Sequence, residues 1–150
     1  GRGGARRAPG AGPVKRLVID TNVLVSALLS PFGAPARVLD AVLAGQVQLL
    51  YDDRILAEYR AVLRRERFGF DLRDVAALLT FIRAEGERVS APPLGFDLPD
   101  PDDAPFIEVA IAGKADALVT GNKAHFPTCA CPGIPVLTPA ELLEHLFPRS

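Results

Sequence analysis

The hydrophobic and polar residues of this chain follow two patterns. Short apolar runs lie at residues 16–19, 47–50, 117–120 and 134–137, and each has the length of a buried strand. Longer segments lie between them, in which apolar residues recur every three or four positions, as on one face of a helix. Strands that alternate with helices predict an α/β fold, with a mostly parallel sheet covered by helices on both faces.

The ends of the predicted helices coincide with start and stop signals in the sequence. The helices are expected at residues 22–29, from Pro35 to Gly45, from Asp52 or Asp53 to about residue 63, from Asp71 to Gly86, from about residue 103 to Gly113, and from Thr138 onward, where a capping box with Glu141 is predicted. The second helix is expected to bury Val38, Leu39, Val42 and Leu43, and the fourth Leu72, Val75, Leu78, Leu79 and Ile82. A brief further strand is expected at Val89-Ser90.

The first apolar run ends directly at Asp20, which the polar pair Thr21-Asn22 and a second apolar segment follow. This order is typical of a buried parallel strand that turns straight into a helix. Ligands of open α/β sheets bind outside the carboxyl ends of the strands, so Asp20 is a candidate cation ligand or catalytic group. Aspartate is also a favoured N-cap, and capping of the following helix accounts for Asp20 equally well.

Four further polar residues lie at strand ends, helix starts or the border of a core face. Glu58 falls about 40° outside the apolar stripe of the third helix, where it would be half buried. Asp102 and Asp103 begin the fifth helix, and Asn122 ends a late strand. Each has an ordinary structural explanation as well. The two aspartates would cap the fifth helix and interact favourably with the positive end of its dipole. Glu58 would be a solvated helix residue, and Asn122 would be a turn residue.

Carboxylates that converge at one sheet edge without basic partners repel one another. A divalent cation compensates for that repulsion, and Mg²⁺ or Mn²⁺ prefers such oxygen ligands. One or two ions could activate water and neutralise charge on a phosphodiester during in-line displacement. The chain has no GxGxxG, GxxxxGK(S/T), GxSxG or HExxH pattern, which disfavours dinucleotide, P-loop, serine-hydrolase and zinc-protease chemistry.

The net charge of −1 conceals two parts of opposite sign. Residues 1–16 carry five basic side chains and no acidic one, so the remainder of the chain carries −6. An acidic body argues against a general basic nucleic-acid-binding surface but allows a carboxylate metal site. Its densest basic cluster is Arg60, Arg64, Arg65 and Arg67, which is either a solvated face or a contact to an RNA backbone.

Cysteine usage and hydropathy make a reducing cytoplasm the default expectation for this protein. Cys129 and Cys131 do not form a disulfide framework, and no apolar run approaches the roughly 20 residues of a membrane span. His125 with the two cysteines is a conceivable zinc cluster, but a structural zinc usually takes four ligands. One domain over residues 16–147 is expected to follow a disordered basic tail at residues 1–15.

Four motifs share their order and spacing with one known family. They are Leu17-Val18-Ile19-Asp20-Thr21-Asn22-Val23-Leu24, Leu56-Ala57-Glu58-Tyr59, Asp102-Asp103-Ala104-Pro105-Phe106-Ile107-Glu108-Val109-Ala110, and Asp116-Ala117-Leu118-Val119-Thr120-Gly121-Asn122 continuing to His125-Phe126-Pro127. With these motifs the chain resembles a PIN domain, a nuclease fold. The resemblance implies a three-layer α/β/α sandwich and a metal-dependent ribonuclease acting on single-stranded RNA. It also suggests a toxin similar to VapC-type toxins, which are neutralised by a small antitoxin and are often homodimers.

Carried over by position, the resemblance makes Asp20, Glu58 and Asp103 the acidic ligands of Mg²⁺ or Mn²⁺. Asp102 remains the alternative to Asp103, which is preferred because the apolar residues after it follow at the family's intervals. Many family members have a fourth acid where this chain has Asn122. Asparagine can offer a carbonyl oxygen or orient water, but it brings no charge, which would weaken a second metal site.

The leading hypothesis is therefore a Mg²⁺- or Mn²⁺-dependent endoribonuclease, in which Asp20, Glu58 and Asp103 bind metal. Asn122 would position water or phosphate, with Asn22, Thr120 or Ser26 as further candidates for this role. A rival from another class is a catalytically weak PIN-like module that binds RNA or a protein partner, which Asn122 and the acidic body favour. A third hypothesis is an α/β phosphatase. It is disfavoured because the run at Asp20 lacks the second aspartate of a DxD motif.

Overall fold

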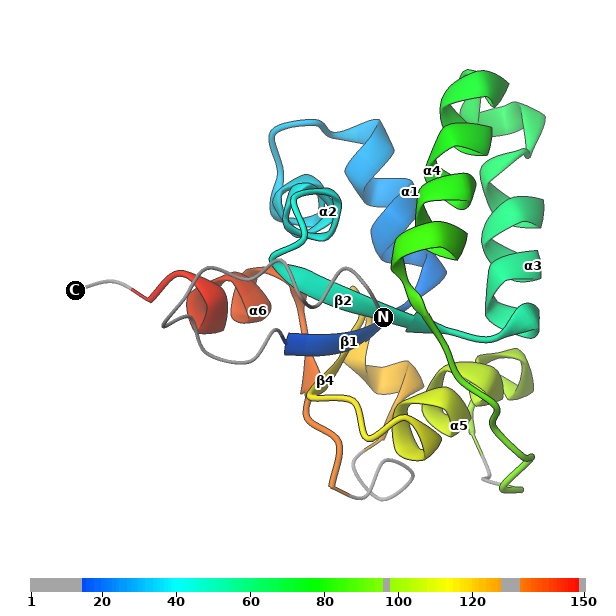
Figure 1. The fold of residues 1–150 in the computed structure, drawn as a ribbon, viewed down its shortest axis with the longest axis vertical. Helices are drawn as coiled ribbons and strands as arrows, with labels where there is room; N and C mark the ends of the chain where they lie inside the picture. Colours follow the sequence, from blue (N-terminus) through cyan, green and yellow to red (C-terminus); the bar gives the residue numbers. More distant parts are fainter. Residues whose placement is uncertain (1–14, 96–97, 128–132, 149–150) are drawn as a thin grey trace.

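The computed structural model describes residues 15–95, 98–127 and 133–148, which contain one five-stranded sheet with the order β3-β2-β1-β4-β5 (Figure 1). The strands are β1 (Lys15–Ile19), β2 (Val47–Tyr51), β3 (Glu87–Arg88), β4 (Ala117–Val119) and β5 (Val136–Leu137), and every pair is parallel. Strands β2 and β3 are added in turn on one side of β1, and the chain then crosses over to add β4 and β5 on the other side. The point between β1 and β4 is therefore the topological switch point, where α/β sheets bind their ligands.

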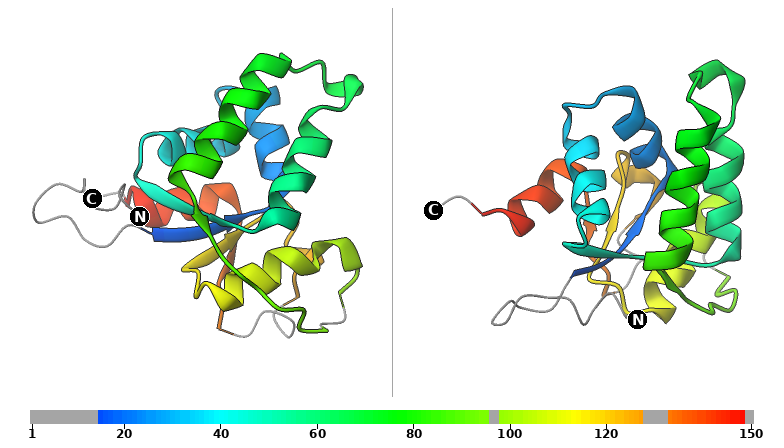
Figure 2. Two further views of the ribbon diagram at one scale, coloured as in Figure 1. Left: turned by 45° about the vertical axis from the view of Figure 1, so that its right-hand side comes forward. Right: turned by 45° about the horizontal axis from the view of Figure 1, so that its top comes forward.

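Helices cover both faces of this sheet, which confirms the predicted three-layer α/β/α architecture. They are α1 (Thr21–Leu29), α2 (Ala34–Leu43), α3 (Asp53–Leu63), α4 (Leu72–Glu85), α5 (Ala104–Ala112) and α6 (Pro139–Leu146). Helices α1 to α4 lie on one face and α5 on the other, while α6 packs against α2 beside β5 (Figures 1 and 2). The capping box of Thr138 and Glu141 is formed as predicted, and Asp52 rather than Asp53 caps α3.

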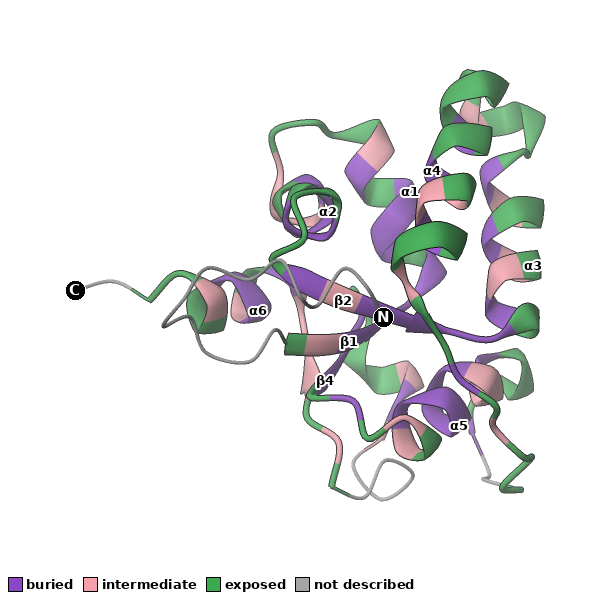
Figure 3. Cartoon of the chain, in the orientation of Figure 1, coloured by how far each residue is buried: buried purple, intermediate pink, exposed green. Residues whose placement is uncertain are grey.

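The core lies on both sides of the central strand. Leu17, Val18 and Ile19 of β1 are fully buried, which explains why this strand is an unbroken apolar run rather than an alternating one. Helix α5 is buried over most of its length, whereas α3 and α4 present exposed outer faces (Figure 3). The sequence of α5 is correspondingly apolar, and the sequence of α3 is amphipathic.

The structure corrects three details of the expected core and sheet. Leu43 and Leu72 are 45% and 55% exposed. Each is the terminal residue of its helix, where no neighbouring element extends far enough to cover the predicted apolar face. The short third strand is Glu87–Arg88 rather than Val89-Ser90, although the Val89 N–H still donates to the Tyr51 carbonyl at 2.7 Å. The last strand keeps only the second half of its predicted run.

Several predictions fall outside the described residues, or touch them at one point only. The basic tail lies outside them except for Lys15, which is the first residue of β1, and so do Cys129 and Cys131 of the conceivable zinc cluster. Over the described ranges, no single helix is long and apolar enough to cross a membrane. The bent pair α1 and α2, at 104°, meets that test only in combination, by length and composition.

Candidate functional site

The carboxyl ends of β1 and β4 bring Asp20 and Thr120 together at the switch point. Both residues are buried, and the Thr120 hydroxyl donates a hydrogen bond of 2.8 Å to Oδ2 of Asp20. The Asp20 N–H extends the β ladder by donating to the Val119 carbonyl at 2.8 Å. Parallel pairing of β1 with β4 therefore fixes this carboxylate, because its backbone and its side chain both bond to the neighbouring strand end.

Asp20 does not act as the helix cap that its sequence context allows. It occupies the N-cap position of α1, but its side chain makes no capping hydrogen bond. Burial raises the pKa of Asp20, and Thr120, His125 and the backbone N–H groups of Thr21 and Asn22 only partly offset this effect. The carboxylate is thus held at the sheet edge at an energetic cost that capping does not explain.

Glu58 reaches the same region from the middle of α3. It is half-buried, as its position beside the apolar stripe predicts, and it accepts a hydrogen bond from the Thr21 hydroxyl at the start of α1. Burial raises the pKa of Glu58, and the nearby carboxylates of Asp20, Asp102 and Asp100 raise it further. The adjacent Tyr59 is buried and donates from its hydroxyl to the Ile19 carbonyl at 2.5 Å, which anchors α3 beside β1.

Asp103 enters from the opposite layer, at the end of the short 3-10 helix η3 (Pro101–Asp103). The Asp100 side chain caps this turn by accepting from the Asp102 N–H at 2.9 Å. The turn leaves Asp102 exposed and buries Asp103. Of the two candidate ligands, Asp103 is therefore the one that faces inward.

One oxygen of Asp103 has no hydrogen-bond partner among the described residues. Oδ2 is buried, and Nδ1 of His125 lies 3.2 Å from it in a geometry that makes no hydrogen bond. Burial raises the pKa of Asp103 to about 6, the Asp20 and Asp100 carboxylates add to this effect, and His125 opposes it. A buried, unsatisfied carboxylate oxygen is rare in folded proteins and is often a sign of a functional group.

Asn122 lies at the rim of this group rather than inside it. The residue is exposed, and its Oδ1 accepts from the Ala124 N–H at 3.2 Å, which caps the 3-10 helix η4 (Lys123–His125). Its backbone N–H donates to the Thr120 hydroxyl at 3.1 Å. Asn122 is therefore connected to Asp20 through Thr120, but its amide oxygen is occupied by a cap.

The structure thus brings the carboxylates of Asp20, Glu58 and Asp103 close enough to interact electrostatically, and Asn122 lies at the edge of this group. The three carboxylates come from the end of β1, from α3 and from η3. Asp20 raises the pKa of both Glu58 and Asp103, and Glu58 also raises that of Asp103. In the described parts of the chain, no three His, Cys, Asp or Glu side chains are already arranged to hold one ion together. The oxygen donors, the like charges and the orphaned Oδ2 nevertheless fit a divalent cation in charge and ligand type.

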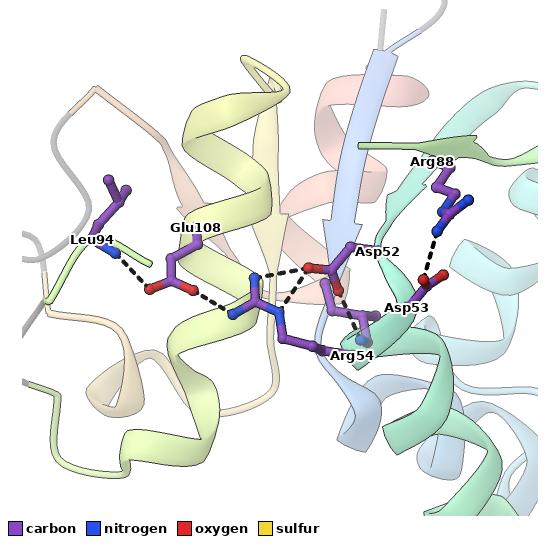
Figure 4. A network of polar contacts seen from close by, with 7 residues as sticks. Asp52, Asp53, Arg54, Arg88, Leu94 and Glu108 are labelled. Atoms are coloured by element: carbon purple, nitrogen blue, oxygen red, sulfur yellow. Dashed lines mark hydrogen bonds and ion pairs between the residues drawn. The ribbon is translucent and has the colours of Figure 1, made fainter. Parts of the chain in front are cut away.

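A second group of acidic side chains is paired with arginines (Figure 4). Glu108 of α5 is buried; it accepts from Arg54 at 2.6 Å with one oxygen and from the Leu94 N–H at 2.8 Å with the other. Arg54 also donates to Asp52 at 2.8 Å, and Asp52 accepts from the Ile55 N–H at 3.0 Å. This Arg54 network joins the start of α3, helix α5 and the segment before η3.

Sequence reasoning did not single out Arg54, Glu108 or Thr21. Glu108 was detectable, because a charge between Ile107 and Val109 interrupts an otherwise apolar helix. Thr21 and Arg54 have no comparable signal, since a threonine and an arginine near a helix start are common surface residues. Their partners depend on which elements pack together.

A parallel α/β domain with buried acids at its switch point is the class of protein that this geometry defines. The family model of the PIN domain matches residues 16–124. The uncharacterized protein MJ1680 of Methanocaldococcus jannaschii is 32% identical over 113 residues, which cover 72% of this chain and 71% of that protein. The chain belongs to the PIN domain family.

Two solved structures share the fold at low sequence identity. One is the crystal structure of VapBC2 from Rickettsia felis bound to a DNA fragment from their promoter, with a TM-score of 0.55 and 18% identity over 82% of this chain and 98% of that chain. The other is PAE2754 from Pyrobaculum aerophilum, with a TM-score of 0.52 and 18% identity over 91% of each chain. At this identity the likeness supports the fold alone.

Proposed function

We propose that this PIN domain protein is a metal-dependent endoribonuclease that hydrolyses phosphodiester bonds of single-stranded RNA. The observation that carries the proposal is the group of Asp20, Glu58 and Asp103 at the switch point, with raised pKa values and an unpartnered buried oxygen. Folded proteins rarely keep such a group without a counter-charge. A site that binds a cation in function explains why the three acids are kept together.

Asp20, Glu58 and Asp103 would hold Mg²⁺ or Mn²⁺. When bound, such an ion supplies Lewis-acid activation of water and neutralises charge on the phosphate. Thr120 donates to Oδ2 of Asp20 and so fixes the orientation of this carboxylate. Thr21 holds one oxygen of Glu58 in the same way, so each hydroxyl orients a carboxylate.

Hydrolysis at this site would need no covalent intermediate with the protein. Asp103 Oδ2, which has no hydrogen-bond partner in the described residues, is the oxygen best placed to change partners when a ligand arrives. Asn122 would act at the rim, where its backbone already contacts Thr120, and would orient water or phosphate rather than bind metal by charge.

We further propose a role as the toxin of a toxin–antitoxin pair, because the motifs of this PIN domain resemble those of VapC-type toxins. In that role the protein would act in the cytoplasm, a small antitoxin would neutralise it, and a homodimer would be the form that meets the antitoxin. Co-expression with the neighbouring open reading frame, followed by co-purification, tests this part separately from the chemistry.

Cleavage of a labelled single-stranded RNA tests the chemistry. Wild-type protein with Mn²⁺ is compared with wild-type protein in EDTA and with the Asp20→Asn, Asp103→Asn double variant. Cleavage should be lost in both, while Asp40→Asn, a matched change of an exposed acid on α2, should cleave normally. Equal cleavage by the double variant and the wild type would contradict the proposal.

The second candidate function is a catalytically weak module that binds RNA or a protein partner. It is favoured by Asn122, whose exposed amide caps η4 at the position where many family members carry an acid. Calorimetry with Mn²⁺ separates the two functions. Binding that disappears in the Asp20→Asn, Asp103→Asn variant favours the nuclease, and a folded wild-type protein without affinity below the millimolar range favours the binding module.

A further inference from the structure

The far end of the α3–α4 hairpin carries four exposed arginines, Arg60, Arg64, Arg65 and Arg67, which we call the arginine tip. We infer that the arginine tip is a docking surface for the backbone of single-stranded RNA, which it holds beside the cleavage site. This inference rests on the proposed function and names a surface that positions its substrate.

The first observation is that the arginine tip is not neutralised by the protein. Arg16, Arg54 and Arg88 each form ion pairs with carboxylates at 2.6–2.8 Å. Across the described ranges, no guanidinium group of the arginine tip forms an ion pair or a hydrogen bond with a carboxylate. In an otherwise acidic body, this cluster remains available to an anionic ligand.

The second observation is an aromatic pair at the same place. The Arg67 guanidinium lies 4.8 Å from the centroid of the Phe68 ring, and the Phe68 and Phe70 rings stack at 5.4 Å with an interplanar angle of 14°. Gly69 between them adopts a left-handed φ of 65°, which turns the chain so that the two rings face each other. Both rings are half-buried and pack partly against the core, so only part of each is exposed beside the arginines. Single-stranded nucleic acids bind basic side chains next to exposed aromatic surface, because phosphates and bases are contacted together.

The third observation is the direction of α3. This helix starts at the sheet edge and runs away from it toward the α3–α4 turn (Figures 1 and 2). Glu58 lies on it, and the last helical residue, Leu63, follows about 7.5 Å further along the axis; Arg64 is the C-cap, and Arg65 begins the turn that follows. An RNA strand whose scissile phosphate lies by Glu58 would therefore meet the arginine tip when it extends along α3.

The alternative occupant of such a surface is an acidic protein segment. The aromatic pair favours RNA, since an acidic peptide needs the charges but has no bases to stack. The decisive measurement must therefore separate the charge of the ligand from its bases.

Fluorescence anisotropy of a labelled 20-nucleotide RNA in EDTA measures binding without cleavage. The test variant is Arg64→Ala, Arg65→Ala, Arg67→Ala, and its control is Lys15→Ala, Arg37→Ala, Lys114→Asn, which removes the same charge from exposed positions elsewhere. The test variant should bind at least about tenfold more weakly, and the slope of log affinity against log salt should fall by about 2, or about 0.7 for each lost phosphate contact. The control should bind within about twofold of wild type.

Phe70→Leu keeps every charge and should weaken RNA binding by about fivefold, because a stacking partner is lost. A polyglutamate peptide is titrated against the same proteins. Unchanged RNA binding by the triple arginine variant overturns the inference, as does an equal loss in the control. Loss of polyglutamate binding with intact RNA binding assigns the surface to an acidic protein and also overturns it.

Cleavage assays in Mn²⁺ separate this inference from the proposed function. Wild-type protein that binds RNA through the arginine tip but never cleaves it contradicts the nuclease and leaves the docking surface standing. Cleavage with the same KM in wild type and the triple arginine variant contradicts the docking surface and leaves the nuclease standing. The expected result is a raised KM with a kcat close to that of wild type.

Discussion

Two groups of buried and half-buried acids in this protein are stabilised in opposite ways. In the Arg54 network, Asp52 and Glu108 share one guanidinium and accept two backbone N–H groups (Figure 4). At the switch point, Asp20, Glu58 and Asp103 receive hydroxyl donors and one loosely placed imidazole, but no arginine or lysine. The carboxylates of the Arg54 network thus have their counter-charge within the protein, whereas those at the switch point do not.

The difference supports separate roles for the two groups. Burial of a carboxylate is tolerated when its charge is paired and its lone pairs are satisfied. The Arg54 network meets both conditions and ties three segments together, including the one that leads to η3. The switch-point group meets neither condition fully, so its energetic cost is relieved only by a proton or a cation. The paired network is structural, and the unpaired group is the candidate site.

The largest expected contrast is between Glu58→Gln and Glu108→Gln in RNA cleavage. Glu58→Gln should lower kcat/KM by about 100-fold or more, because it removes a proposed metal ligand and its charge. Glu108→Gln should lower it much less, because Glu108 only supports the loop before η3. Similar losses in the two variants, measured on the same RNA in Mn²⁺ at a temperature where both are folded, would contradict this division of roles.

A cation should stabilise the protein through one group only. At a Mn²⁺ concentration 100 times the dissociation constant, the free energy of unfolding should rise by about 2.7 kcal/mol. Asp20→Asn with Asp103→Asn should abolish this gain, whereas Arg54→Met should keep it. Thermal unfolding with and without Mn²⁺ measures the effect. A gain that survives in the double aspartate variant would place the ion elsewhere.

Arg54→Met should destabilise the protein by about 2 kcal/mol, because Glu108 would remain buried without its counter-charge. This loss of stability is smaller than that for a fully buried ion pair, because the Arg54 side chain is 41% exposed and solvent screens its charge. Urea unfolding measures the loss. Arg54→Met combined with Glu108→Gln should recover part of it, because the uncompensated charge is gone; a double variant less stable than both single ones contradicts the pairing argument.

The smallest expected effect is a pH dependence of stability. The pKa of Asp103 is raised from 3.8 to about 6, so between these pH values the folded protein holds a proton that the unfolded chain has released. Stability should therefore fall as the pH rises through this window, by on the order of 1–2 kcal/mol. Urea unfolding at pH 4.5 and pH 7 measures the change. Asp103→Asn should flatten the profile, and an unchanged slope in that variant would assign the proton to another group.

Much of the fold was predictable from local patterns. The buried runs of β1, β2 and β4, the capping box of α6 and the parallel three-layer arrangement follow from apolar period and end signals, which depend on neighbouring residues alone. The exposed Leu43 and Leu72 and the shifted β3 were not predicted correctly. Helix ends and edge strands depend on whether another element extends far enough to cover them.

The sequence by itself determined the types of residue at the candidate site and the family to which the chain belongs. Only the tertiary structure decided that Thr120 rather than a helix end bonds Asp20, that Asp103 turns inward while Asp102 faces solvent, and that Glu108 meets Arg54. The physical reason is distance along the chain. The hydroxyl that bonds Glu58 lies 37 residues away in the chain and the one that bonds Asp20 lies 100 residues away, and no local pattern encodes these partners.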